Sequence, residues 1–168
     1  MNNDGGRRMK KYGLVLLTFV PIIAGYILNL TILVPGIGTL LYYLLPLLTT
    51  VFWLWTGMQF ARSSWKNVPA LLIGNATAVG SLLLFLCLQF FAAEGTRFLP
   101  LMVFSQMFGT SAPNFLLARL ALLFESEPNT IGTASFVALK VISVVFMIAV
   151  FCAGFFCEKM RARKSANR

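Results

Sequence analysis

Four polar side chains lie in and after the interruption of one apolar segment, and they are the residues of this chain best placed to bind a ligand. The segment covers residues 98–124, and residues 109–114 at its middle are turn-forming. A helix that starts at this break has a positively polarised amino end, which can hold an anion beside a cationic side chain. The candidate binding residues are Ser111, Asn114, Arg119 and Lys140. In this interpretation Ser111 caps a short helix that has Pro113 in its first turn.

A structural interpretation of the two cations competes with the binding site. Arg119 lies five residues before the end of its apolar segment, so its side chain can extend to the membrane surface. Lys140 precedes 17 further residues of apolar helix, up to Cys157, so it also fits an interfacial position. From the sequence both interpretations stay open.

Composition argues against most kinds of catalysis. The chain has no histidine, and its five acidic residues lie at or beyond the ends of apolar segments. Imidazole metal sites, histidine triads, paired carboxylates and the intramembrane carboxylates of proton-coupled carriers are therefore missing. A Ser/Lys pair of Ser105 or Ser111 with Lys140 is a remaining nucleophilic alternative, but its spacing specifies nothing. We expect a protein that is not an enzyme, with no cofactor, metal site or nucleic-acid partner.

The cysteines are embedded in apolar segments. Cys87, Cys152 and Cys157 are odd in number, and the spacing of Cys152 and Cys157 puts them on different faces of a helix. This argues against an extracellular disulfide framework. We expect three small buried hydrophobic side chains.

The overall composition is that of an all-α integral membrane protein. Apolar residues make up 58% of the 168-residue chain and charged residues only 11%, which cannot cover a soluble domain of this size. We expect one transmembrane helical domain over residues 13–157, between a basic amino terminus (1–12) and a basic tail (158–168). Pro21 should bend the first helix and leave a carbonyl for a neighbouring helix or side chain to satisfy. The apolar segments are 13–34, 39–61, 68–93, 98–124 and 131–157.

The number of spans depends on the interrupted segment, residues 98–124. Each half of it is only about ten residues long, too short to cross a bilayer, which favours a re-entrant hairpin and four spans over five spans. With four spans, 11 of the 14 cations and both termini lie on the cytoplasmic side, as the positive-inside rule expects. Short loops and basic ends are typical of small proteins of the bacterial cytoplasmic membrane. The 11 cations are Arg7, Arg8, Lys10, Lys11, Arg62, Lys66, Lys159, Arg161, Arg163, Lys164 and Arg168.

Small residues spaced along the third segment predict close helix packing. Residues four apart lie on one side of a helix, and small side chains there let another helix approach closely. The predicted packing residues are Gly74, Ala76, Ala78 and Gly80. We expect a non-enzymatic subunit or accessory protein that contacts lipid and either a membrane-protein partner or a second copy. The alternative is a small permease or substrate-binding transport component, with the broken helix as its site for an anionic solute or lipid.

Overall fold

The structure, a computed structural model, describes residues 11–91, 99–124 and 132–166. These residues form helices and connections, with no strand among them. The helices are α1 (Lys11–Leu17), α2 (Val20–Thr31), α3 (Ile37–Arg62), α4 (Asn67–Phe90), α5 (Leu99–Thr110), α6 (Asn114–Ala121) with a 3₁₀ turn η2 (Leu122–Phe124), and α7 (Thr133–Ala166).

Within the described residues, four helical stretches are long and apolar enough to cross a membrane. Their outward faces carry many large apolar side chains, for example Leu72, which is 68% exposed. Such a surface suits contact with lipid and not with water. The predicted helical class is confirmed. The four stretches are Tyr12–Thr31, Ile37–Arg62, Asn67–Phe90 and Thr133–Ser165.

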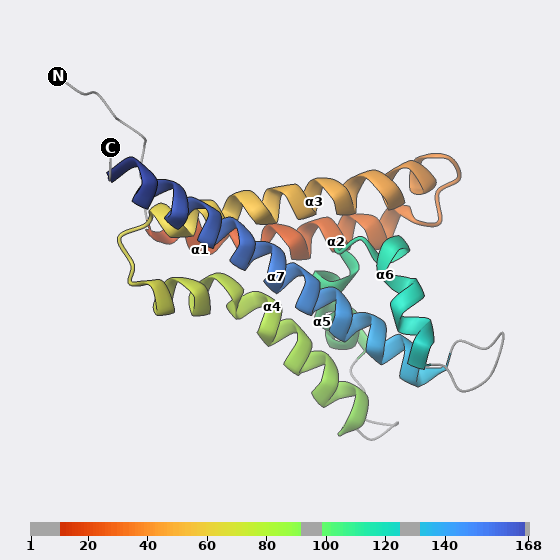
Figure 1. The fold of residues 1–168 in the computed structure, drawn as a ribbon. Helices are drawn as coiled ribbons and strands as arrows, with labels where there is room; N and C mark the ends of the chain where they lie inside the picture. The colour runs from red at the N-terminus through yellow and green to blue at the C-terminus, as the bar shows by residue number, and fades with distance from the viewer. Residues whose placement is uncertain (1–10, 92–98, 125–131, 167–168) are drawn as a thin grey trace.

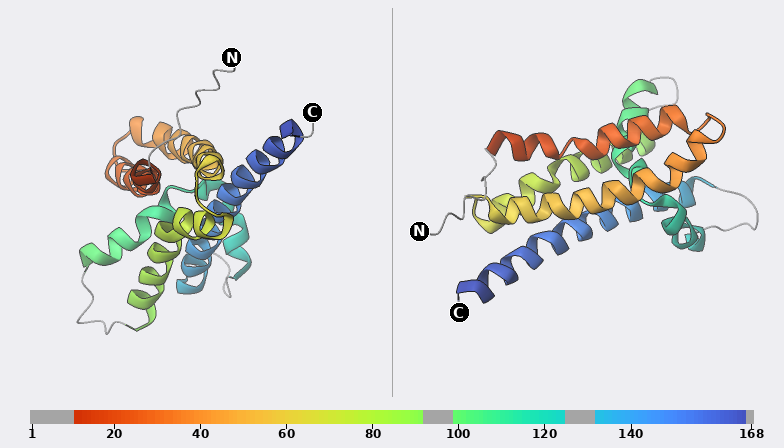
Figure 2. Two further views of the ribbon diagram at one scale, coloured as in Figure 1. Left: turned by 90° about the vertical axis from the view of Figure 1, so that its left-hand side faces the viewer. Right: turned by 90° about the horizontal axis from the view of Figure 1, so that it is seen from above.

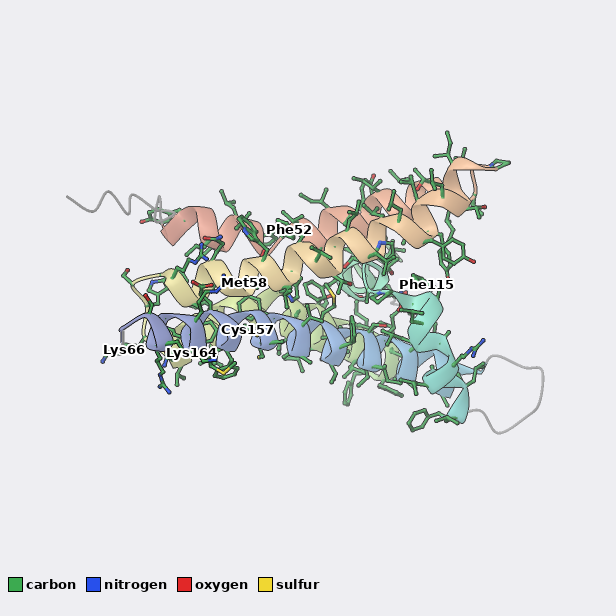
Figure 3. All side chains as sticks on the ribbon, turned by 45° about the horizontal axis from the view of Figure 1, so that its top comes forward. Phe52, Met58, Lys66, Phe115, Cys157 and Lys164 are labelled. Carbon is green, nitrogen blue, oxygen red and sulfur yellow. The ribbon has the colours of Figure 1, made fainter. Side chains whose placement is uncertain are left out.

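The long helices run between two ends of the bundle. The start of α1, the connection from α3 to α4 and the finish of α7 lie together at one end (Figure 1). We call this the basic end, because it carries cations such as Lys66 and Lys164 (Figure 3). The turn from α2 to α3 lies at the opposite end. Most of the described cations are thus gathered at one end, although they come from distant parts of the chain; Arg119 and Lys140 lie elsewhere.

The first long stretch is interrupted shortly before Pro21. Residues 18–19 form a turn between α1 and α2, and Pro21 is in the first turn of α2. Thr77 of α4 donates a hydrogen bond to the Thr18 carbonyl at 3.0 Å. A neighbouring helix therefore satisfies one backbone carbonyl at this break. The carbonyl freed by the missing N–H of Pro21 is that of Leu17, and its partner stays a prediction.

The helices α3 and α7 pack together more extensively than any other pair. A Cβ atom added to Gly57 would collide with the backbone carbonyl of Phe151, and one added to Gly154 would collide with that of Leu54. Only glycine at these two positions permits so close an approach. Where α3 ends, Arg62 Nε lies 2.8 Å from Glu158 Oε1 of α7. Buried aromatic rings fill the space around this crossing: Trp53, Phe60, Phe151 and Phe155.

The helices α5 and α6 form a sharply bent pair. Their axes differ by 101° across a break of a few residues. α5 packs on α2 and α4, and α6 packs on α7. Figure 2 (right) shows both helices in the half of the bundle away from the basic end. Because Gly25 of α2 lies directly against the Met107 backbone, α5 is held close to α2.

Candidate functional site

The break between α5 and α6 is buried and is closed by local hydrogen bonds. Ser111 is buried, and its Oγ donates to the Phe108 carbonyl at 2.7 Å. α6 begins at Asn114 with Pro113 as its N-cap and no side-chain cap. The prediction that Ser111 caps this helix is therefore wrong. The hydroxyl instead returns to α5, whose last carbonyls lack helical partners.

Asn114 joins the break to α7. Its Nδ2 donates to the Gly109 carbonyl at 3.1 Å, and its Oδ1 accepts a hydrogen bond of 2.5 Å from Ser143 Oγ. Ser143 Oγ also lies 2.6 Å from the Leu139 carbonyl, so its one hydrogen is shared between two acceptors. Both ends of the amide thus have partners within the protein. One side chain connects the end of α5, the start of α6 and the middle of α7.

Lys140 lies next to the same break. Its Nζ donates to Thr110 Oγ1 at 3.1 Å, and it lies 5.5 Å from the centroid of the Phe136 ring. The Thr110 hydroxyl in turn donates to the Gln106 carbonyl at 3.0 Å. Among the described residues the ammonium group therefore has a hydroxyl and an aromatic face as partners, and no carboxylate.

The space beside Lys140 is small. The cavity there measures about 10 Å³ and is lined by residues of α4, α5 and α7, including Phe85, Gln106 and Val144. A volume of this size holds at most one water molecule. Among the described residues, the cavity beside Lys140 is too small for a larger solute.

Arg119 does not join the other three predicted binding residues. It is exposed and lies in the last turn of α6. It is five positions after Asn114, which places it about 7.5 Å along the helix axis and about 140° around it. The structure brings Ser111, Asn114 and Lys140 to the break and leaves Arg119 outside.

Two residues of this network were not predicted from the sequence. Thr110 contacts Lys140, and Ser143 contacts Asn114. Thr110 belongs to the turn-forming residues 109–114, and Ser143 is three residues after Lys140, hence on the same side of a helix. These two positions in the sequence were the signals from which Thr110 and Ser143 could have been predicted.

The predicted small-residue face of α4 divides into a buried and an exposed half. Gly74 and Ala78 are buried, and Gly74 lies against the Phe151 ring, where a Cβ would collide. Ala76 and Gly80 are exposed, and nothing lies within 4 Å of a Cβ added to Gly80. A contact between Ala76 or Gly80 and another helix stays a prediction.

Gly80 lines an open groove of about 200 Å³, which we call the α4 groove. Its two α4 hydroxyls are already bonded, Thr77 to the Thr18 carbonyl and Ser81 to the Ser105 carbonyl. The groove therefore presents an apolar surface that another helix can approach closely. The hydroxyls of Thr77 and Ser81 are not free to donate to a ligand. It is lined by Phe19, Ile22, Thr77, Gly80, Ser81, Leu84, Phe104 and Ser105.

The cysteines are free thiols. Cys152 is half-buried, whereas Cys87 and Cys157 are exposed, so the expectation that all three are buried is wrong for these two. An exposed position on an apolar helix surface suits a thiol that contacts lipid. In the described ranges no three histidine, cysteine or acidic side chains lie close enough together to hold a metal ion.

The comparisons with known proteins give no family. No protein-family model matches the chain, and neither a curated protein nor a solved structure shows significant similarity to it.

Proposed function

We propose that this protein is a non-enzymatic membrane subunit or accessory protein that acts by helix packing. Its proposed working surface is the α4 groove, and the occupant is a transmembrane helix of a partner membrane protein. The observation that carries this proposal is the open space at Gly80 beside hydroxyls that are already bonded. Such a surface lets a helix backbone approach closely but gives a polar solute nothing to bind.

The packing of the break supports a subunit over the transport alternative. A permease site at the broken helix needs a cavity and groups free to bind an anion. Here Asn114 is bonded to Gly109 and Ser143, and Lys140 adjoins a cavity of only about 10 Å³. These contacts suit a structural role for the polar residues, which hold the bent pair against α7.

The proposed topology has four spans and a re-entrant hairpin formed by α5 and α6. Two features support it: α5 and α6 are 12 and 8 residues long, and both lie in one half of the bundle (Figure 2). If α5 and α6 were the two halves of a single broken span, they would lead to opposite ends of the bundle. An even number of spans would leave both termini on the same side, and the cations of the basic end support the cytoplasmic side of a bacterial cytoplasmic membrane as that side. The division into residues 1–12, 13–157 and 158–168 remains a prediction.

The proposed function is tested by filling the α4 groove. The protein is extracted in mild detergent with an affinity tag, and its bound partners are quantified for the parent, for Gly80→Leu and for a matched control. Val79→Leu is the control, because Val79 is exposed on α4 but does not line the groove. A stoichiometric partner that is lost in Gly80→Leu and kept in Val79→Leu is the expected result.

The same preparation separates the competing explanations. If the partner is a second copy of this chain, Gly80→Leu converts an oligomer into a monomer. A parent protein that is monomeric, carries no partner and binds a small solute contradicts the proposal and restores the transport alternative.

A further inference from the structure

A second cavity, far from the break between α5 and α6, lies at the basic end. It has a volume of about 170 Å³ and is formed between the start of α4 and the last part of α7. Figure 3 places Lys66, Lys164 and Cys157 in this region of the molecule. The lining residues are Asn67, Phe155, Phe156, Lys159, Met160 and Arg163.

The cavity has an excess of positive charge. Lys159 and Arg163 are four residues apart on α7, so they lie on one side of the helix and repel each other. Glu158, the one carboxylate in the described part of the chain, is engaged by Arg62 at 2.8 Å. Lys159 Nζ instead lies 5.6 Å from the centroid of the Phe155 ring. An anion placed in the cavity would relieve the repulsion between the two cations.

The start of α4 adds to this positive potential. α4 begins at Asn67 without a side-chain cap, so its first backbone amides have no helical partner. Asn67 itself lines the cavity. The positive end of the helix dipole and two cations from α7 therefore converge on one space.

The remaining walls of the cavity are apolar. Phe155 is buried, whereas Phe156 and Met160 are 53% and 56% exposed. Trp65, two residues before Asn67, packs against Phe60 with ring centroids 5.6 Å apart. Tryptophan is typical of the interface between lipid headgroups and acyl chains. The cavity thus combines anion-attracting groups with apolar surface at the expected headgroup level.

We propose that this cavity binds the phosphate of an anionic glycerophospholipid, with its glycerol and upper acyl chain against Phe156 and Met160. The cations and the α4 amino end face the phosphate, and the apolar walls face the hydrocarbon. Basic pockets between transmembrane helices bind lipid headgroups for this reason. Free phosphate would use only the polar half of the cavity, so the lipid is the better occupant.

The test measures binding of phosphatidylglycerol to the purified full chain in detergent, by thermal stabilisation and by native mass spectrometry. Phosphatidylcholine with the same acyl chains is the neutral comparison. The double variant Lys159→Gln/Arg163→Gln should bind phosphatidylglycerol about thirtyfold more weakly, since each cation near a membrane surface contributes about a factor of five. The matched control is Arg161→Gln/Lys164→Gln, which removes the same charge outside the cavity lining.

A second variant tests the cavity without removing a cation. Asn67→Asp places a negative charge on the cavity wall, at a helix start where aspartate does not destabilise α4. It should weaken phosphatidylglycerol binding while leaving the melting temperature of the lipid-free protein unchanged. Unchanged phosphatidylglycerol binding in both Lys159→Gln/Arg163→Gln and Asn67→Asp would overturn the proposal.

Two further results would overturn it in different ways. Equal loss in the control double variant would show a diffuse basic surface instead of a defined cavity. Displacement of the lipid by millimolar inorganic phosphate or glycerol 3-phosphate would show that a soluble phosphate is the ligand. Retained binding in the control, with no competition by either soluble anion, is the expected outcome.

Discussion

Gly57 of α3 and Gly154 of α7 each lie against the backbone of the opposite helix. The Cβ position of Gly57 falls on the Phe151 carbonyl, and that of Gly154 falls on the Leu54 carbonyl. The two positions are reciprocal, because Phe151 is three residues before Gly154 and Leu54 is three residues before Gly57. The short distance between α3 and α7 at their crossing therefore depends on the absence of side chains at Gly57 and Gly154.

Adding a methyl group at this crossing should destabilise the bundle. Gly57→Ala and Gly154→Ala should each cost about 1 to 3 kcal/mol, because backbone atoms must move apart to admit the methyl group. The free energy of unfolding in mixed detergent micelles measures the effect. Gly80→Ala, where nothing lies within 4 Å, is the control and should change stability little. Equal tolerance at all three positions would show that α3 and α7 are not in backbone contact.

The hydrogen bond between Ser143 and Asn114 should stabilise the bent pair. Breaking it with Asn114→Ala or Ser143→Ala should cost up to about 1.7 kcal/mol, the upper range measured for hydrogen bonds between membrane helices. Asn114→Ala should cost more than Ser143→Ala, because it also removes the 3.1 Å hydrogen bond to the Gly109 carbonyl, which keeps only the 3.3 Å bond from the Ala112 N–H. A double-mutant cycle on unfolding free energies gives the coupling. Strictly additive losses would contradict a direct contact.

Lys140 and Arg119 should be dispensable for anion binding if the break is structural. Lys140→Met keeps the side-chain volume, and Thr110 keeps its bond to the Gln106 carbonyl, so no buried group loses its partner. Arg119→Gln changes an exposed residue and should alter stability by less than about 0.5 kcal/mol. Thermal stability is compared with and without anionic solutes. Loss of an anion-dependent stabilisation in either variant would instead favour the transport alternative.

Both ends of the chain should be cytoplasmic. This follows from the bent pair in one half of the bundle and from the clustering of cations at the basic end. Reporter fusions inserted at Ser64 and placed after Arg168 should both report the cytoplasm. If the Ser64 fusion is internal and the Arg168 fusion is external, the chain crosses five times and the hairpin assignment is wrong.

Local properties of the sequence predicted the helices better than they predicted the contacts between the helices. Hydropathy and length marked the long helices, and Pro21 and residues 109–114 marked the two breaks, because these signals act within one segment. Gly57 and Gly154 were not singled out, since neither belongs to a run of small residues as long as that of residues 74–81. Their importance depends on which helices pack together, which one sequence does not specify.

The sequence predicted only part of the candidate site, because the rest of the site also depends on which helices pack together. Nearness along the chain grouped Arg119 with Ser111 and Asn114, but the rotation of α6 takes Arg119 to the outside. The hydrogen bond that organises the break joins residues 29 positions apart. Whether Gly80 faces outward also depends on how α4 is rotated against α5 and α7, so only its small size was visible in the sequence.

The bond from Ser143 to the break has a consequence for assembly in the membrane. A ribosome makes α5 and α6 before α7, so Asn114 emerges before the hydroxyl that satisfies its carbonyl oxygen. Until α7 enters the bilayer, the tip of the hairpin carries an unpaired polar group, which is costly in hydrocarbon. The hairpin should therefore wait at the water-exposed surface or within the insertion machinery and move to its final depth together with α7. Chains arrested before residue 143 should leave Asn114 accessible to water-soluble probes.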